Sequence, residues 1–492
     1  MIAAFIGQAT GIFLEFLFMI FSAKIYGAYI YGQFTFAYTI ISIVVVFTKC
    51  GFENSILYYC ARNDIGTANK RCIVHNSILI STILCLFVIC LFFTGNDFFI
   101  TLCGDSGLEL KYFRYMLPII FLETINALLL AVIRGLKKIG SYYLGYTIIP
   151  YAIRLVLVFL FRLFRIDSFL AIIIAYILGC FLSIIFCVIS LVDTRLLFGS
   201  RSEFSFSDLL KMSVPVLMAG AVSVINNKVD QYMVGFWCGS NKVAVYSMAM
   251  NIGKVSSFAL VAINSFFAPY ISDYYSSGQK EKLKDMYSRT TRWAILFSAL
   301  ILGFVSIFSF DIMEVIGEEY VYGSVVLIIV AAGELFNSMV GSVGYLNTMT
   351  GKANYMFVAS FSSVLLNIYA NYRLIPQYGI FGAAIASAGA VVLCNLLNFI
   401  FMYYNLRIQP YTKKTINIVI VVFCAVAAMV GLRNVFGHDS IDMLITYGIV
   451  YVLISIVGTL WCVCDSKERV LFLRYVCRIK NFIIKSNIFR KC

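Results

Sequence analysis

Residues 168–192 read SFLAIIIAYILGCFLSIIFCVISLV, a stretch that contains no aspartate, glutamate, lysine or arginine. An α-helix rises about 1.5 Å per residue, so about 20 apolar residues cross a hydrocarbon core about 30 Å thick. The stretch is therefore long enough to span a membrane as a single helix.

Similar apolar runs recur along the whole chain with short polar breaks between them. Charged residues make up 13% of the chain and hydrophobic residues 61%, whereas a soluble domain carries roughly 25% charge. We therefore predict an all-α membrane protein with about 14 transmembrane helices. The predicted spans are 2–27, 32–58, 73–94, 112–133, 142–164, 168–192, 210–238, 243–271, 291–313, 322–346, 355–374, 380–404, 415–432 and 441–464.

The start of the chain and its cysteines point to no other class of protein. The first run has no basic segment ahead of it and no A-x-A cleavage site, so we expect a retained helix instead of a signal peptide. The 15 cysteines are scattered without a C-x-x-C pair, and the two histidines, His75 and His438, are far apart. We expect no metal, no cofactor and no catalytic residue.

Basic residues predict the orientation in the membrane. With the N-terminus inside, 26 of the 38 lysines and arginines fall on cytoplasmic loops and the tail, and eight on the opposite side. Cytoplasmic loops are enriched in lysine and arginine, so we expect both termini in the cytoplasm and an even number of helices. This topology accounts for the net charge of +14 without a nucleic-acid partner.

The C-terminal tail and an internal repeat predict the domain organisation. Residues 31–37 (YGQFTFA) match 243–249 (VAVYSMA) at an offset of 212, and Gly27 meets Gly239 at the same offset. We expect two lobes of six helices with the site between them. The predicted parts are an N-lobe (1–196), a C-lobe (205–408), helices 13–14 (409–464) and a basic amphipathic tail (465–492) that lies on the membrane or docks a partner.

Ionisable residues within spans are the candidate site residues, because each costs about 2.5–3.5 kcal/mol on insertion. Interhelical pairing or snorkelling is the alternative, above all for Lys24. The candidates for substrate binding are Lys24, Lys49, Arg154, Lys228 and Lys254. The candidates for a coupling ion or proton are Glu15, Glu123, Asp230 and Glu334. Their net charge of +1 mildly favours an anionic substrate. The densest polar stretch within a span is 226–231 (NNKVDQ).

Several sequence motifs resemble those of a known family. AKIYG (23–27), YGQF (31–34) and KCGF (49–52) resemble the start of Wzx-type O-antigen and capsule flippases of the MATE-like (MOP) superfamily. The second half contains further matching stretches, DQYMVG (230–235), VYSMAM (245–250), APYISD (268–273) and LIPQYGIFGAAIA (374–386). The resemblance extends to about residue 406.

This resemblance implies two lobes around a central cavity that flip an undecaprenyl-diphosphate-linked oligosaccharide across the cell (inner, cytoplasmic) membrane by alternating access. It also implies a polysaccharide polymerase and chain-length proteins as partners. Related lipid II flippases use cationic residues in helices 1, 2 and 8, a part that Lys24, Lys49 and Lys254 would play here by position.

Three alternatives to this function remain. A lipid II-type flippase would look much the same, and a MATE-type cation-coupled multidrug exporter would favour acidic cavity residues. A membrane glycosyl polymerase would carry a larger outer loop than 95–111, the longest one predicted. No G-x-x-x-x-G-K-[ST] phosphate loop occurs, so we expect an ion gradient or downhill transport instead of ATP hydrolysis.

Overall fold

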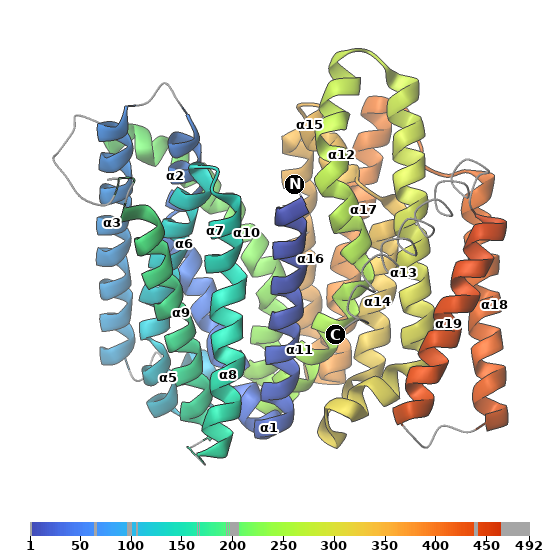
Figure 1. Ribbon diagram of the computed structural model, residues 1–492, viewed down its shortest axis with the longest axis horizontal. Helices are drawn as coiled ribbons and strands as arrows, with labels where there is room; N and C mark the ends of the chain where they lie inside the picture. The colour runs from blue at the N-terminus through green and yellow to red at the C-terminus, as the bar shows by residue number, and fades with distance from the viewer. Residues whose placement is uncertain are drawn as a thin grey trace, which may run out of the picture. The chain divides into compact units, whose positions relative to one another are not determined.

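All regular elements in the described part of the chain are helical. The computed structural model describes residues 2–62, 66–95, 101–104, 107–164, 166, 168–192, 194, 196, 206–436 and 441–463; the predicted tail helix (465–492) lies outside them. The longer helices of the first half are α1 (Ile2–Lys49), α2 (Phe52–Ala61), α3 (Thr67–Thr94), α5 (Leu110–Met116), α6 (Pro118–Gly135), α7 (Ile139–Tyr143), α8 (Ile149–Leu163), α9 (Ser168–Val192) and α10 (Phe206–Cys238). Those of the second half are α11 (Ser240–Lys254), α12 (Phe258–Ser276), α13 (Lys280–Ile316), α14 (Ser324–Val340), α15 (Val343–Met349), α16 (Ala353–Tyr378), α17 (Ile380–Leu406), α18 (Lys413–Phe436) and α19 (Ile441–Cys462) (Figure 1). A π-helix, η1 (Leu144–Ile148), and two 3-10 helices, η2 (Val255–Ser257) and η3 (Glu318–Gly323), complete the list.

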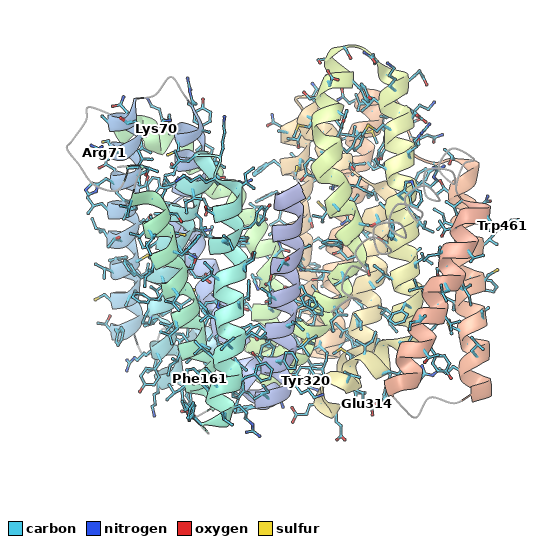
Figure 2. All side chains as sticks on the ribbon, viewed as in Figure 1. Lys70, Arg71, Phe161, Glu314, Tyr320 and Trp461 are labelled. Atoms are coloured by element: carbon cyan, nitrogen blue, oxygen red, sulfur yellow. The ribbon has the colours of Figure 1, made fainter. Side chains whose placement is uncertain are left out.

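Nine helices within the described ranges are long and apolar enough to cross a membrane. The stretch 168–192 forms one of them, α9, as predicted. The chain is therefore a multi-pass membrane protein. In α3 only 22% of the most apolar window is buried, and exposed side chains such as Leu79, Ile83 and Phe87 would face lipid. Figure 2 shows Trp461, which is 77% exposed, pointing away from α19.

The first two predicted spans are joined in α1. Gly27, with φ 80° and ψ 166°, marks a kink between its two halves. Beyond it, the Ala28 backbone N–H donates to a carboxylate oxygen of Glu319 at 3.0 Å. Gly239, which the repeat pairs with Gly27, separates α10 from α11 with φ 83°. Both glycines therefore lie at breaks between helical segments with a positive φ, which glycine adopts without a Cβ clash.

The predicted span 32–58 is wrong in its bounds, since it is not one helix. The helix α1 ends at Lys49 and α2 begins at Phe52, because Cys50 and Gly51 have φ of 50° and 72°. A Cβ at Gly51 would overlap the backbone of Ser213 in α10. Glycine at this position thus permits both the turn and the close approach of α10.

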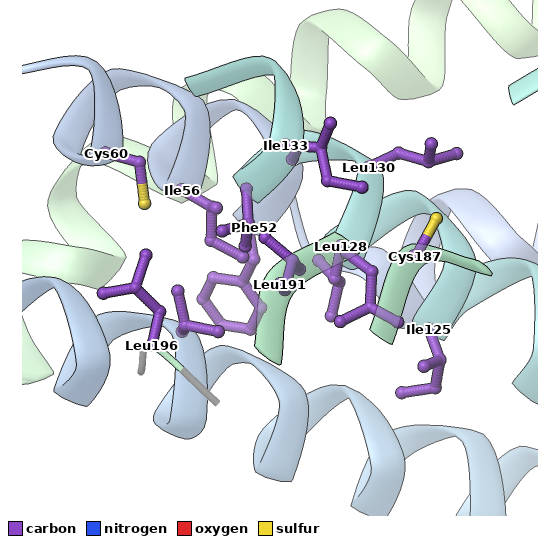
Figure 3. Close-up of a cluster of buried hydrophobic side chains, with 14 of the residues drawn as sticks. Phe52, Ile56, Cys60, Ile125, Leu128, Leu130, Ile133, Cys187, Leu191 and Leu196 are labelled. Carbon is purple, nitrogen blue, oxygen red and sulfur yellow. The ribbon is translucent and has the colours of Figure 1, made fainter. Parts of the chain in front are cut away.

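The chain divides into two compact units. Unit 1 comprises 1–252, 312–330 and 357–394, and unit 2 comprises 253–311, 331–356 and 395–492. The division into lobes of six, six and two helices stays a prediction. In unit 1, α2, α3, α6 and α9 meet in an apolar core, whose buried members include Phe52, Ile56, Cys60, Ile125, Leu128, Leu130, Ile133, Cys187 and Leu191 (Figure 3).

Unit 2 holds two smaller apolar clusters. One joins α12, α13, α15 and α17 around Phe267, Tyr287 and Met402. In the other, α18 packs on α13. An ion pair between Arg433 and Asp311, with Nη1 3.2 Å from the carboxylate, also links these two helices.

Two glycines of unit 1 provide a matched test of packing. A Cβ at Gly32 would overlap the Ser240 carbonyl, whereas a Cβ at Gly389 in α17 would meet nothing within 4 Å. We expect Gly32→Ala to destabilise the protein by about 1–3 kcal/mol through overpacking. Gly389→Ala should be neutral or stabilise it by up to about 1 kcal/mol. Thermal unfolding of both purified variants in detergent measures this, and equal midpoints would contradict the described packing of α1 on α11.

Candidate functional site

A polar cavity of about 550 Å³ lies within unit 1. Its walls come from α1, α6, α7, η1, α8 and α9. Four of the nine predicted site residues, from three helices, line it, together with Arg134, which was not predicted. The charged lining residues are Glu15, Lys49, Glu123, Arg134 and Arg154. In an otherwise apolar helical unit, such a concentration of charge marks a functional site.

Six tyrosines form much of the cavity wall: Tyr38, Tyr142, Tyr143, Tyr146, Tyr151 and Tyr176. Several rings contact each other, with centroids 5.2 Å apart for Tyr38 and Tyr176 and 5.4 Å apart for Tyr142 and Tyr146. Each ring offers an apolar face and a hydroxyl. The cavity can therefore contact an amphiphilic solute over large flat surfaces.

Glu123 of α6 is held by two of these tyrosines. Tyr38 donates to its Oε1 at 3.0 Å, and Tyr176 donates to the same oxygen. One turn of α6 further on, Asn126 lines the cavity and accepts a hydrogen bond from Ser183 at 3.0 Å. The carboxylate is thereby oriented by neutral hydroxyl donors.

Arg154 of α8 is 4% exposed and stacks on aromatic rings. Its Cζ lies 3.5 Å from the ring centroid of Tyr176 and 4.9 Å from that of Tyr151. Its Nη2 donates to the Cys180 sulfur at 3.0 Å, while its Nε is buried without a hydrogen-bond partner. Among the contacts of the described residues it has no ion pair with a carboxylate. Cation–π contacts thus offset only part of the desolvation of this charge.

Two further basic residues line the cavity, and we call Lys49 and Arg134 the basic pair. Lys49 ends α1 and forms an ion pair with Glu53 at 2.8 Å. Arg134 lies in the last turn of α6, with Cζ 5.5 Å from the ring centroid of Tyr142. The basic pair belongs to helix ends, where charged groups reach water and anionic headgroups most readily.

The π-helix η1 supplies part of the tyrosine wall. It lies between α7 and α8, and Tyr146 and Thr147 from it line the cavity. A Cβ at Gly11 of α1 would overlap Thr147, so this close packing of α1 requires glycine. Such π turns are rare and occur frequently at functional sites.

Asp230 does not line this cavity. It is 1% exposed in α10 and accepts hydrogen bonds from Tyr246 at 2.6 Å and Ser387 at 2.7 Å. Asn226, one turn earlier, accepts through its backbone oxygen from Asn367 at 3.4 Å. The predicted polar stretch 226–231 thus contacts α1, α11, α16 and α17 within unit 1.

The remaining predicted residues lie apart from the cavity lining. Lys24 is exposed and donates to the Val315 carbonyl at 3.3 Å. Lys228 donates to Gln231 at 3.1 Å and lies 5.8 Å from the ring centroid of Tyr38. The other two residues belong to unit 2. Lys254 ends α11, and the buried Glu334 accepts a hydrogen bond from Asn337.

Unit 2 contains a larger cavity of about 940 Å³ between α13 and α19. The side chains assigned to its wall are apolar, aromatic, hydroxyl-bearing or glycine, and none is charged. It suits a hydrocarbon chain and offers nothing to a polar solute. Of these two cavities, the tyrosine-lined cavity of unit 1 is the one whose walls carry charged side chains.

Sequence reasoning missed Arg134 and the gathering of tyrosines. Arg134 counted only as a loop charge, and aromatic residues at membrane helix ends normally form interfacial belts. The one available signal was the density of tyrosine in 142–151 (YYLGYTIIPY).

Two curated proteins of glycan and capsular polysaccharide biosynthesis are similar to this chain. The chain is 23% identical over 246 residues to a probable low-salt glycan biosynthesis flippase of Haloferax volcanii. This alignment covers 49% of each protein. It is 22% identical over 205 residues to the capsular polysaccharide biosynthesis protein CapF of Staphylococcus aureus, which covers 40% of this chain and 50% of CapF. The chain thus spans about half the length of these curated relatives.

Solved structures show the same fold at low sequence identity. A lipid II flippase MurJ in an inward closed conformation aligns with a TM-score of 0.76 and 15% identity, over 93% of this chain and 98% of that one. An inward-facing multidrug resistance MATE family transporter of the MOP superfamily aligns with a TM-score of 0.68 and 14% identity, over 80% of this chain and 94% of that one. These similar proteins are flippases and transporters.

Family models match both halves of the chain. The MatE model matches residues 215–373. The polysaccharide biosynthesis protein model matches residues 1–275, more than half of the chain. With its multi-pass helical fold, the chain belongs to the polysaccharide biosynthesis protein family.

Proposed function

We propose that this protein flips undecaprenyl-diphosphate-linked oligosaccharide repeat units across the cytoplasmic membrane by alternating access, for O-antigen or capsule synthesis. The observation that carries the proposal is the cavity of unit 1, which joins basic residues and tyrosine walls inside an apolar helical unit. Its relatives include a glycan biosynthesis flippase and a capsular polysaccharide biosynthesis protein.

The basic pair would receive the diphosphate. A diphosphate carries roughly two negative charges, and moving them unpaired through hydrocarbon is prohibitive. Lys49 and Arg134 both line the cavity, and charge-assisted hydrogen bonds to phosphate are among the strong ones. The tyrosine rings would stack on the sugars, while the polyprenyl tail stays in lipid.

The topology that goes with this proposal has fourteen helices in lobes of six, six and two, with both termini cytoplasmic. Arg134 then belongs to a cytoplasmic loop, so the basic pair would meet the substrate from the inner leaflet. Polysaccharide polymerase and chain-length proteins would act on the flipped product on the other side.

A coupling ion would bind near Asp230. Two buried side-chain oxygens on neighbouring helices, Asn226 Oδ1 and Asn371 Oδ1, have no hydrogen-bond partner. They would add oxygen ligands to the Asp230 carboxylate. Oxygen ligands of this type suit a small hard cation. Glu15 and Glu123 in the cavity and Glu334 in unit 2 are the other carboxylates that could exchange a proton; Lys24, Lys228 and Lys254 would add positive charge along the substrate path.

Two related functions remain as alternatives. A lipid II-type flippase would use the same diphosphate contacts, and its fold is the one seen in MurJ. A cation-coupled multidrug exporter would use the fold seen in the MATE transporter. The cavity of unit 1, with three basic and two acidic residues, favours a substrate that carries negative charge.

Deletion of the gene in its host tests the direction of transport. We expect lipid-linked repeat units to accumulate on the inner leaflet, because synthesis continues without export. Accessibility of the glycan to an added lectin or glycosidase, before and after membrane opening, measures the leaflet. Accumulation on the outer leaflet would indicate a polymerase, and increased drug sensitivity without accumulation would indicate an exporter.

Neutralising the basic pair tests the diphosphate contact. We expect Lys49→Gln and Arg134→Gln each to slow flipping by roughly 10-fold or more, the equivalent of about 1.5–3 kcal/mol for a charge-assisted hydrogen bond. The assay is flipping of a lipid-linked oligosaccharide in vesicles that contain equal amounts of protein. Lys284→Gln, an exposed residue paired only with Glu281 at 4.0 Å, is the control; equal rates in all three variants would exclude the contact.

Neutralising Asp230 tests the coupling site. An imposed sodium or proton gradient should accelerate flipping by the wild type several-fold. Asp230→Asn should flip at a slow rate that no gradient changes, because the carboxylate that binds the cation is gone. Undiminished acceleration in this variant would assign coupling to another carboxylate.

A further inference from the structure

Glu123 and Arg154 contact the same tyrosine, Glu123 at its hydroxyl and Arg154 at the face of its ring. The Tyr176 hydroxyl donates to Glu123 Oε1, and the Tyr176 ring centroid lies 3.5 Å from Arg154 Cζ. The contacts of the described residues include no ion pair between the two charges. We call Glu123 and Arg154 the polar pair; both line the cavity of unit 1.

Each member of the polar pair can still bind a ligand group in the cavity. Both tyrosine hydroxyls bond to Oε1 of Glu123, so Oε2 remains as an acceptor. Arg154 lines the cavity and has no carboxylate partner among the contacts of the described residues. A buried charge without such a partner is costly, and a ligand that accepts a hydrogen bond from the guanidinium would lower this cost.

The charges of the polar pair select among ligands. An anionic group would be attracted by Arg154 and repelled by Glu123, and a cationic group would meet the reverse. A neutral group that carries both an N–H donor and a C=O acceptor would bond to both residues without repulsion. An acetamido group has these two functions on one planar unit, and its methyl group would contact an aromatic ring such as Tyr151.

Resting on the proposed flippase function, we propose that Glu123 and Arg154 bind the acetamido group of an N-acetylated amino sugar in the translocated oligosaccharide. The N–H donates to Glu123 Oε2, and the carbonyl accepts from Arg154. The diphosphate remains with Lys49 and Arg134. The net positive charge of the cavity therefore serves the lipid head, whereas the sugar is recognised by a charge-balanced site.

Binding of two disaccharides to the purified full chain in detergent tests this assignment. Diacetylchitobiose and cellobiose share one glucose backbone and differ in carrying acetamido or hydroxyl groups. We expect diacetylchitobiose to bind at least about tenfold more tightly, measured by calorimetry and by the rise in unfolding temperature. Tenfold corresponds to 1.4 kcal/mol, less than a hydrogen bond to a charged group can contribute. Equal binding of the two would overturn the proposal, as would tighter binding of glucuronic acid or glucosamine.

Variants locate the preference. Glu123→Gln and Arg154→Gln should each bring the ratio of the two affinities toward one, while Lys284→Gln keeps it at the wild-type value. Tyr176→Phe keeps the ring under Arg154 and removes one hydroxyl from Glu123, so it should reduce the ratio less than Glu123→Gln does. If both Glu123→Gln and Arg154→Gln keep the wild-type ratio of the two affinities, these residues do not bind the acetamido group.

Failure of this inference is distinguishable from failure of the proposed function. A protein that flips lipid-linked oligosaccharide in vesicles but binds both disaccharides equally would retain the function and lose the acetamido site. A protein that prefers diacetylchitobiose but flips no glycolipid would retain the site and lose the function.

Discussion

Hydrocarbon solvates a charge far more poorly than water does, and a helix that carries charge through a membrane must supply the missing partners itself. Unit 1 meets this requirement in three ways. Arg154 stacks on the π faces of Tyr176 and Tyr151. Glu123 accepts hydrogen bonds from phenol hydroxyls, and Lys49 forms an ion pair with Glu53. The arrangement of α1, α6, α8 and α9 follows from these contacts as much as from apolar packing, because tyrosine donors on one helix satisfy charges on another.

On the proposed function, the cavity and the Asp230 cluster would divide two chemical tasks within the same unit. The cavity is lined with aromatic faces and charges of both signs, which suits a large, flexible and weakly bound sugar chain. Asp230 is surrounded by short hydrogen bonds from Tyr246 and Ser387, which suits a small ion held tightly. Since α10 carries Lys228 beside Tyr38 and also Asp230, one rigid helix connects the two places.

Apolar periodicity and length were sufficient to predict a multi-pass helical protein, because hydrocarbon thickness fixes how long a spanning helix is. They did not predict that 32–58 breaks at Gly51, since that break depends on the approach of Ser213 from α10. Charge within predicted spans drew attention to Glu15, Lys49, Glu123 and Arg154, which line one cavity. The same argument also selected Glu334, and Lys24 with snorkelling as its alternative, because a sequence does not reveal which face of a helix meets a neighbour. The tyrosine walls of the cavity were not predicted for a related reason: a tyrosine in lipid headgroups and one in a cavity look identical in sequence.

The π turn at 144–148 has a consequence for how this family diversifies. A π turn accommodates one extra residue in a helix, so the residues after it are rotated relative to those before it. Family members with a regular α-helix here would be one residue shorter in this segment, and an alignment would place the gap between Tyr143 and Ile149. A single-codon insertion or deletion at this point would change which α8 side chains face the cavity of unit 1, while the helices before the turn keep their packing.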